Sequence, residues 1–199
     1  MNTPNKITSA RLLLSILILT LLLVPLGKLG INLPKIIVKG YILVDTKYCL
    51  AGVLFIIASV TDFLDGYIAR KRNLITDLGK VLDAIADKLL VNGVLIILAT
   101  TGFISPVIPV VVISRDTIVD CIKMVAGQKQ GAVAASKLGK IKTTFMMIGV
   151  SLTLFYNLPF ELFNFRLSDI FLIVATSLSV ISGIEYYLKN RAIIVENGI

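Results

Sequence analysis

The chain has 199 residues, of which 56% are hydrophobic and only 16% are charged. Because charged residues make up about a quarter of a typical soluble domain, this composition excludes an ordinary soluble fold and indicates an integral membrane protein. The sequence contains no histidine, which excludes Ser-His-Asp and Cys-His nucleophiles and zinc sites with histidine ligands. An enzyme of this composition must rely on carboxylates, lysine, arginine, hydroxyl groups and bound metal.

Apolar runs about as long as the hydrocarbon core of a bilayer recur along the chain, which predicts an all-α integral membrane bundle of six transmembrane helices in a single domain, residues 1–199. The first run follows Lys6 and Arg11 and lacks a small-x-small cleavage site, so we interpret it as a span and not as a signal peptide. Residues 25–47 form a connecting region whose short apolar piece, Ile36–Val44, fits the membrane interface. The predicted spans are Ile7–Val24, Tyr48–Ile68, Leu78–Thr100, Ile104–Val125, Ile141–Tyr156 and Asp169–Leu188.

The distribution of Lys and Arg predicts the orientation, because basic residues collect at the cytoplasmic ends of spans. Most of them lie in the loops around Arg70–Lys80 and Lys123–Lys142 and near the two termini. We therefore expect a multi-pass protein of the cell membrane with both termini and both loops in the cytoplasm. The net charge of +8 fits contact with anionic lipid head groups. The basic residues lack interleaved aromatic side chains, so no nucleic-acid partner is expected.

A group of carboxylates lies where the second and third spans meet the cytoplasm. Asp62 and Asp65 are three residues apart and Asp83 and Asp87 are four apart, so each pair shares one helix face. The short loop between the two helices makes them antiparallel neighbours, which brings the four acids together. Such a cluster persists only if cations bind it, and oxygen ligands favour Mg²⁺ or Mn²⁺. Asp77 is assigned to the cap of the third helix instead.

Small residues keep bulky side chains away from these carboxylates. Gly66, Ala69 and Gly79 each lie about one helical turn from one of the four acids, which leaves room for a flat or phosphorylated ligand. Asn5 and Thr8 lie one turn apart on the first helix, at the same side of the membrane. They are interpreted either as an ordinary interfacial start of the helix or as part of the site.

Two further polar groups allow more than one interpretation. Arg115, Asp116 and Asp120 interrupt the apolar fourth span, either as charge pairs that hold helices together or as part of a site. Lys137 and Lys140, with Lys142 after them, begin the fifth helix as a basic loop in contact with lipid or as an anion site. Small residues of the last span, interpreted as positions of close helix packing, are Ser177, Ser179, Ser182 and Gly183.

The stretch from Asp62 to Asp87 resembles, at every fixed position, the DxxDGxxARx₈GxxxDxxxD signature of the CDP-alcohol phosphotransferases, integral membrane enzymes of phospholipid synthesis. Asp87-Lys88-Leu89 and Ser114-Arg115-Asp116 resemble the branch of the family that uses glycerol 3-phosphate. The resemblance implies a homodimer that transfers the phosphatidyl group from CDP-diacylglycerol to glycerol 3-phosphate and releases CMP. It also implies a site for two divalent ions, Mg²⁺ or Mn²⁺.

The resemblance assigns roles to individual residues. Asp62, Asp65, Asp83 and Asp87 hold the two ions, and Asp87 is also the general base. The residues implied for the donor, CDP-diacylglycerol, are Asn5, Thr8, Gly66, Ala69, Arg70 and Gly79. Those implied for the acceptor phosphate are Arg115, Lys137 and Lys140.

Two alternatives to this function stay open at the level of sequence. The same chemistry serves other acceptors, such as inositol phosphate, serine or, in cardiolipin synthesis, phosphatidylglycerol. A cation transporter is the alternative that is not an enzyme. Its ion path requires acids at the membrane midplane or on both sides, whereas the acids of this chain gather at one edge.

Overall fold

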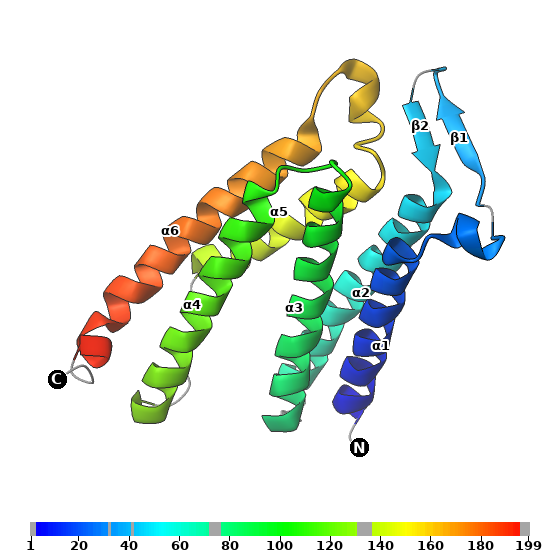
Figure 1. Ribbon diagram of the computed structural model, residues 1–199. Helices are drawn as coiled ribbons and strands as arrows, with labels where there is room; N and C mark the ends of the chain where they lie inside the picture. The colour runs from blue at the N-terminus through cyan, green and yellow to red at the C-terminus, as the bar shows by residue number, and fades with distance from the viewer. Residues whose placement is uncertain (1–2, 32, 41, 72–76, 131–136, 196–199) are drawn as a thin grey trace.

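The computed structural model describes the backbone of residues 3–31, 33–40, 42–71, 77–130 and 137–195, and the side chains of residues 8–31, 33–40, 42–62, 79, 81–127 and 138–191. Six α-helices dominate these parts of the chain (Figure 1). Each predicted apolar run coincides with one of them, which confirms the mostly helical fold. The helices are α1 Thr3–Leu23, α2 Thr46–Lys71, α3 Asp77–Thr100, α4 Val107–Gln130, α5 Lys137–Leu154 and α6 Leu167–Val195.

The turns between helices contain residues with positive φ. Gly102, with φ of 80°, lies in the turn after α3, and Tyr156 and Asn157 after α5 have φ of 58° and 55°. The buried Asn157 side chain then stabilises the second turn. Its Nδ2 donates to the carbonyl of Phe165 at 2.8 Å, and its Oδ1 accepts a hydrogen bond from the backbone N–H of Ser168 at 3.0 Å. These bonds fix the start of α6 relative to the end of α5.

The connecting region after α1 forms a structure that we did not predict. Ile36–Val44, expected only to be too short to span and to fit the membrane interface, is part of an antiparallel hairpin of β1 Lys35–Val38 and β2 Ile42–Asp45. The reason is local, because Lys39 and Gly40 both have positive φ, 49° and 79°, and reverse the chain between the strands. The Ile, Val and Leu residues that looked like an apolar piece also favour extended structure.

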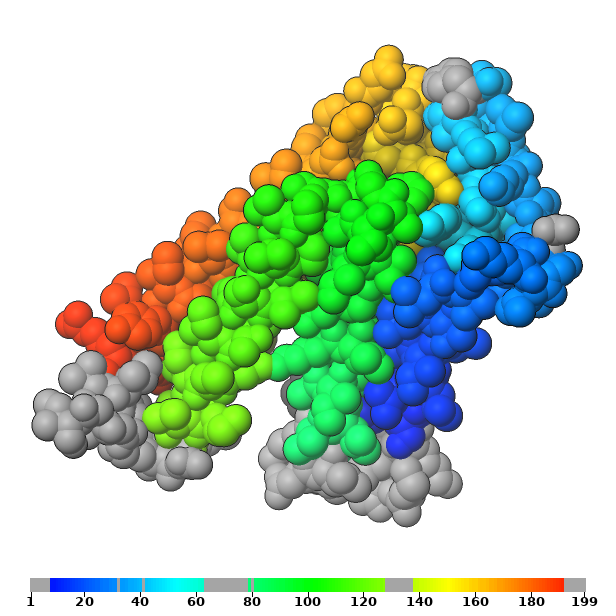
Figure 2. Space-filling view, viewed as in Figure 1, coloured from blue at the N-terminus to red at the C-terminus, as the bar shows by residue number. Residues whose placement is uncertain are grey.

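The helices form two groups of three. α1 packs against α2 and α3, and α6 packs against α4 and α5, whereas α3 and α4 contact each other sparingly. In Figure 1 the start of α1 and the end of α6 lie at the lower end, and the hairpin lies at the upper end. Figure 2 shows the surface hollowed between the lower ends of α3 and α4. The two groups therefore diverge towards the end that carries the predicted site.

Small residues allow the closest helix contacts. A Cβ atom added to Gly93 on α3 would lie 2.6 Å from the Leu19 side chain on α1. One added to Gly149 on α5 would lie 2.9 Å from the Leu172 side chain on α6. Close approach of backbones through small residues is typical of helix packing in lipid.

Within the described residues, one helical segment, Leu167–Arg191 of α6, is long and apolar enough to cross a bilayer, and Thr8–Leu23 of α1 is apolar but shorter. Charged residues such as Asp83 and Arg115 interrupt α3 and α4. Large apolar side chains are nevertheless exposed on all six helices. A bilayer would cover such a surface. Six transmembrane spans remain a prediction.

Candidate active site

Arg11 of α1 joins two of the predicted acids. Its Nη2 donates to Oδ1 of Asp83 on α3 at 2.8 Å, and its Nη1 pairs with Asp62 at the end of α2. The Arg11 side chain is only 2% exposed. Carboxylates from α2 and α3 therefore converge on one cation of α1. We predicted that α2 and α3 would pack directly on each other, but in the described parts of the chain both pack mainly on α1. Asp65, the other acid predicted on α2, lies outside the described side chains.

The acidic residues supply part of a ligand set for a divalent metal. Asp62 and Asp83 offer hard carboxylate oxygens, which Mg²⁺ and Mn²⁺ prefer, and the Arg11 guanidinium marks a position between them that suits positive charge. The side chains that the structure describes include no group of three or more Asp, Glu, Cys or His placed to hold a metal. A site for two ions therefore remains a prediction that also requires Asp65.

Two predicted donor residues fall within the described side chains. Thr8 is buried on α1, one turn before Arg11, and Gly79 lies in the first turn of α3, one turn before Asp83. Both therefore lie at the acidic end of the bundle. The predicted donor residues whose side chains lie outside the description are Asn5, Gly66, Ala69 and Arg70.

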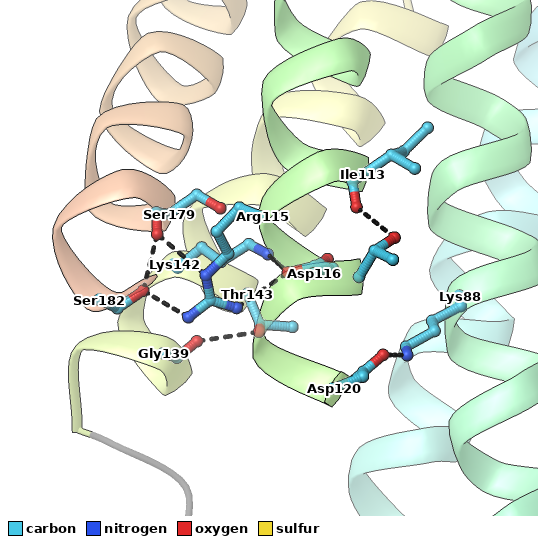
Figure 3. Close-up of polar contacts among 11 residues, drawn as sticks. Lys88, Ile113, Arg115, Asp116, Asp120, Gly139, Lys142, Thr143, Ser179 and Ser182 are labelled. Atoms are coloured by element: carbon cyan, nitrogen blue, oxygen red, sulfur yellow. Dashed lines mark hydrogen bonds and ion pairs between the residues drawn. The ribbon is translucent and has the colours of Figure 1, made fainter. Parts of the chain in front are cut away.

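A second polar cluster connects α4, α5 and α6 (Figure 3). Oδ1 of Asp116 accepts hydrogen bonds from Arg115 Nη1 at 2.8 Å and from Lys142 Nζ at 2.6 Å. Arg115 also donates from Nε to the carbonyl of Ser179 at 3.0 Å and from Nη2 to Oγ of Ser182 at 2.7 Å. The Asp116–Lys142 pair therefore joins α4 to α5, as one of the two interpretations of these charges predicted, and Arg115 joins α4 to α6 through hydrogen bonds.

Arg115 also lines a cavity of about 230 Å³ between α3 and the helices of the second group. Among the described side chains, five basic and three acidic residues line this cavity, so its charge favours an anion. Lys140, predicted to bind the acceptor phosphate, is exposed and belongs to this lining, whereas the Lys137 side chain lies outside the description. The basic side chains are Lys88, Arg115, Lys123, Lys140 and Lys142.

Asp87 lies between the acidic residues and this basic cavity. It follows Asp83 by one helical turn and lines the cavity with Arg115 and Lys142. The neighbouring residue Lys88 forms an ion pair with Asp120 across α3 and α4 (Figure 3). Asp87 therefore presents a carboxylate at the wall of the cavity, one helical turn from Asp83.

The roles implied by the family resemblance did not include Arg11 or Lys142, although Lys142 was among the lysines interpreted as a basic loop or an anion site. Both side chains are nearly buried, and each pairs with an acid on a neighbouring helix. A signal for both existed, because a charged residue inside an otherwise apolar span points to a functional site. Their partners could not be identified from spacing, since they lie on other helices.

A larger cavity, of about 570 Å³, lies at the opposite end of the bundle. It is bounded by β2, the turn after α3 and the connection between α5 and α6. The aromatic rings of Phe103 and Tyr156 contact each other in its wall, with 5.2 Å between the ring centroids. The Tyr156 hydroxyl accepts a hydrogen bond from the backbone N–H of Asp45 at 3.0 Å, which attaches the hairpin to this end. This cavity is remote from Asp62 and Asp83 and plays no part in the candidate site.

Comparison with known proteins agrees with this geometry. A profile of the CDP-alcohol phosphatidyltransferase family matches residues 1–181. A relative from Bacillus subtilis is 44% identical over 95% of this chain and 95% of its own length. Relatives from Mycoplasma pneumoniae and Rickettsia bellii are each 33% identical, over 83% and 94% of this chain and 70% and 93% of their own lengths. All three are named CDP-diacylglycerol–glycerol-3-phosphate 3-phosphatidyltransferase. The chain therefore belongs to the CDP-alcohol phosphatidyltransferase family.

Proposed function

We propose that this protein transfers the phosphatidyl group of CDP-diacylglycerol to a hydroxyl of glycerol 3-phosphate, giving phosphatidylglycerophosphate and CMP. The names of the relatives support this reaction. The observation that carries it is the position of Asp87, one turn from Asp83 on one side and in the lining of the basic cavity on the other. Donor and acceptor can therefore meet at this carboxylate.

The donor diphosphate belongs at the acidic end. Use of divalent metal ions is general in this family, and in our proposal Asp62, Asp65, Asp83 and Asp87 hold two of them. When bound, Mg²⁺ or Mn²⁺ neutralises the charge on the diphosphate and on the departing CMP. Thr8 and Gly79 border this end of the bundle, which fits the role in donor binding that we assign to them with Asn5, Gly66, Ala69 and Arg70.

The acceptor phosphate belongs in the basic cavity. Arg115 presents a planar guanidinium that suits bidentate contact with a phosphate, and Lys142 adds a second cation held beside it by Asp116. Lys140 contributes from the exposed rim, and Lys137 begins the same helix. An acceptor without a phosphate would leave the excess of basic over acidic side chains in this lining unneutralised.

The chemical step needs one base and an in-line arrangement. Asp87 takes the proton from the acceptor hydroxyl, and the oxygen attacks the phosphorus that carries the diacylglycerol. A new oxygen–phosphorus bond forms as the bond from that phosphorus to the CMP oxygen breaks, and the electron pair leaves with CMP. Phosphoryl transfer of this kind depends on positioning and charge neutralisation. A protein without histidine can supply both.

The proposal includes the position of the protein in the membrane. The helix ends that carry Asp62, Asp83 and Lys142 lie at the same end of the bundle as both termini (Figure 1). We propose that all six helices span the cell membrane as one domain, with this end in the cytoplasm, where glycerol 3-phosphate is available. The homodimer implied by the family resemblance is part of the same proposal.

An acceptor panel tests this function. Purified protein is mixed with CDP-diacylglycerol and Mg²⁺ or Mn²⁺, and CMP release is measured with glycerol 3-phosphate, inositol phosphate, serine, glycerol and phosphatidylglycerol in turn. We expect release with glycerol 3-phosphate and formation of phosphatidylglycerophosphate. Activity with a non-phosphorylated alcohol alone would contradict the assignment of the basic cavity.

A further inference from the structure

Two serines of α6, Ser179 and Ser182, lie beside the Arg115 side chain, which comes from α4 (Figure 3). Ser179 and Ser182 are fully buried, and sequence reasoning interpreted both as packing positions. Both nevertheless contact Arg115 through polar atoms. Arg115 Nε donates to the Ser179 carbonyl at 3.0 Å, and Nη2 donates to Ser182 Oγ at 2.7 Å. Helix packing alone requires small side chains but not these hydrogen bonds.

The Ser182 hydroxyl is oriented to accept. Its O–H donates a hydrogen bond to the Ser179 carbonyl at 3.1 Å. A lone pair of Oγ therefore accepts the hydrogen bond from the Arg115 guanidinium. A hydrogen bond to a charged group is stronger than one between neutral groups, and burial away from water increases the difference. This contact therefore contributes to holding the guanidinium in one orientation.

Gly183 provides the space that this orientation needs. A Cβ atom added there would lie 3.0 Å from Cγ and 3.4 Å from Nε of Arg115. The aliphatic part of Arg115 thus lies directly against the backbone of α6. Even the methyl group of alanine would displace it by a few tenths of an ångström.

These contacts leave part of the guanidinium for a ligand. A guanidinium has five N–H groups. Within the described residues, three of those of Arg115 donate hydrogen bonds, to Ser179, Ser182 and Asp116. The remaining N–H groups are at Nη1 and Nη2, the pair of nitrogens that can bind a phosphate in bidentate fashion. Arg115 lines the basic cavity, where such a ligand would lie.

We propose that Ser182, with Ser179 and Gly183, is a positioning element that presents Arg115 to the phosphate of the acceptor. The inference rests on the proposed function and extends it to α6, a helix outside the sequence motif. Fixing the side chain before the ligand arrives reduces the entropy that binding costs. The positioning element should therefore affect binding of the acceptor and not binding of the donor.

Steady-state kinetics of three variants test the proposal. Ser182→Ala removes the accepting oxygen, Gly183→Ala displaces the Arg115 side chain, and Ser177→Ala is the matched control. Ser177 is exposed on the same helix and bonds back to the carbonyl of Ile173. We expect Ser182→Ala to raise the KM for glycerol 3-phosphate about tenfold, corresponding to one lost hydrogen bond to a charged group. Gly183→Ala should also raise this KM, because it displaces the Arg115 side chain. The KM for CDP-diacylglycerol should stay unchanged in both variants. The control should match the wild type.

A double-mutant cycle connects the effect to Arg115. In an Arg115→Ala background, Ser182→Ala should cause no further loss of kcat/KM for the acceptor, because the group it positions is gone. Independent losses, an unchanged acceptor KM in Ser182→Ala, or equal increases of both KM values would overturn the positioning role.

The acceptors that the wild-type protein uses distinguish a failure of the positioning role from a failure of the proposed function. If the wild type turns over a different phosphorylated acceptor, the proposed acceptor is wrong, and the same comparison of variants then decides the positioning role with that acceptor. A wild type that is inactive with every phosphorylated acceptor overturns both.

Discussion

Lys142 Nζ lies 2.6 Å from Oδ1 of Asp116, and that same oxygen accepts a hydrogen bond from Arg115 at 2.8 Å. One carboxylate thus holds cations from α4 and α5 side by side at the wall of the basic cavity. Like charges in a partly buried position repel each other unless an opposite charge lies between them. Asp116 therefore both stabilises the bundle and maintains the charge that suits an anionic acceptor.

Replacing Asp116 with Asn should destabilise the protein. The change keeps the size of the side chain but removes the charge between Arg115 and Lys142, and we expect a loss of about 2–4 kcal/mol in the free energy of unfolding. Unfolding in detergent measures it. Asp169→Asn is the control, because Asp169 pairs with the exposed Arg166 at 3.7 Å and should contribute less than about 0.5 kcal/mol. Equal losses in the two variants would contradict the role of Asp116.

Replacing Lys142 with Met should weaken acceptor binding selectively. The Lys142 side chain is 8% exposed and faces the basic cavity, so its charge acts on a ligand there with little screening. We expect the KM for glycerol 3-phosphate to rise about tenfold or more with little change for the donor. Lys189→Met, at an exposed lysine that pairs with Glu185, is the control. A rise confined to the KM for CDP-diacylglycerol would show that Lys142 acts in donor binding and would contradict its role in acceptor binding.

Periodicity and length were sufficient to predict the helices of this fold. Six apolar runs, each about as long as a membrane span, predicted the six helices, and most predicted helix ends lie within a few residues of the observed ones. The hairpin at Lys35–Asp45 was not predicted, because its turn depends on positive φ at Lys39, a residue that does not usually signal a turn. The alternation that marks a strand was too short there to distinguish it from an apolar piece.

The candidate site was predicted only where its residues share a helix or adjacent helices. Spacing predicted that Asp62 and Asp83 lie close together because α2 and α3 would pack on each other. In the described parts of the chain both helices instead pack mainly on α1, whose Arg11 pairs with both acids. Spacing could not show that Arg11 pairs with both acids or that Arg115 lies against Ser182, because those contacts depend on how whole helices pack, which spacing along the chain does not give. Ser182 was consequently interpreted from its size alone.

Replacing Arg11 with Gln should make the protein more responsive to metal. Without the guanidinium, Asp62 and Asp83 face each other unneutralised, so we expect the metal-free protein to lose about 2–4 kcal/mol of stability. A divalent ion no longer competes with Arg11 for these carboxylates and should stabilise the variant more than the wild type. Thermal unfolding in EDTA and in Mn²⁺ measures both effects. An identical response of the two proteins to Mn²⁺ would show that Arg11 does not compete with a metal.

Replacing Gly149 with Ala should separate α5 from α6. The added Cβ would lie 2.9 Å from the Leu172 side chain and 3.2 Å from its backbone nitrogen, so a helix must move, at a cost of about 1–3 kcal/mol. Gly127→Ala on α4 is the matched change, because nothing lies within 4 Å of its added Cβ. It should be neutral or stabilise the helix by up to about 1 kcal/mol. Equal thermal stability of the two variants would contradict the tight packing of α5 on α6.

The proton transfer assigned to Asp87 is tested most directly by glycerol 3-phosphate-dependent release of CMP from the Asp87→Asn variant. Asparagine keeps the shape of the side chain but cannot accept the proton, and Asp169→Asn makes the same change at the opposite end of the bundle. We predict that kcat falls at least about a hundredfold in Asp87→Asn, as for loss of a general base, and stays at the wild-type value in Asp169→Asn. Turnover of Asp87→Asn at the wild-type rate, in a protein that is equally well folded, would contradict the assignment.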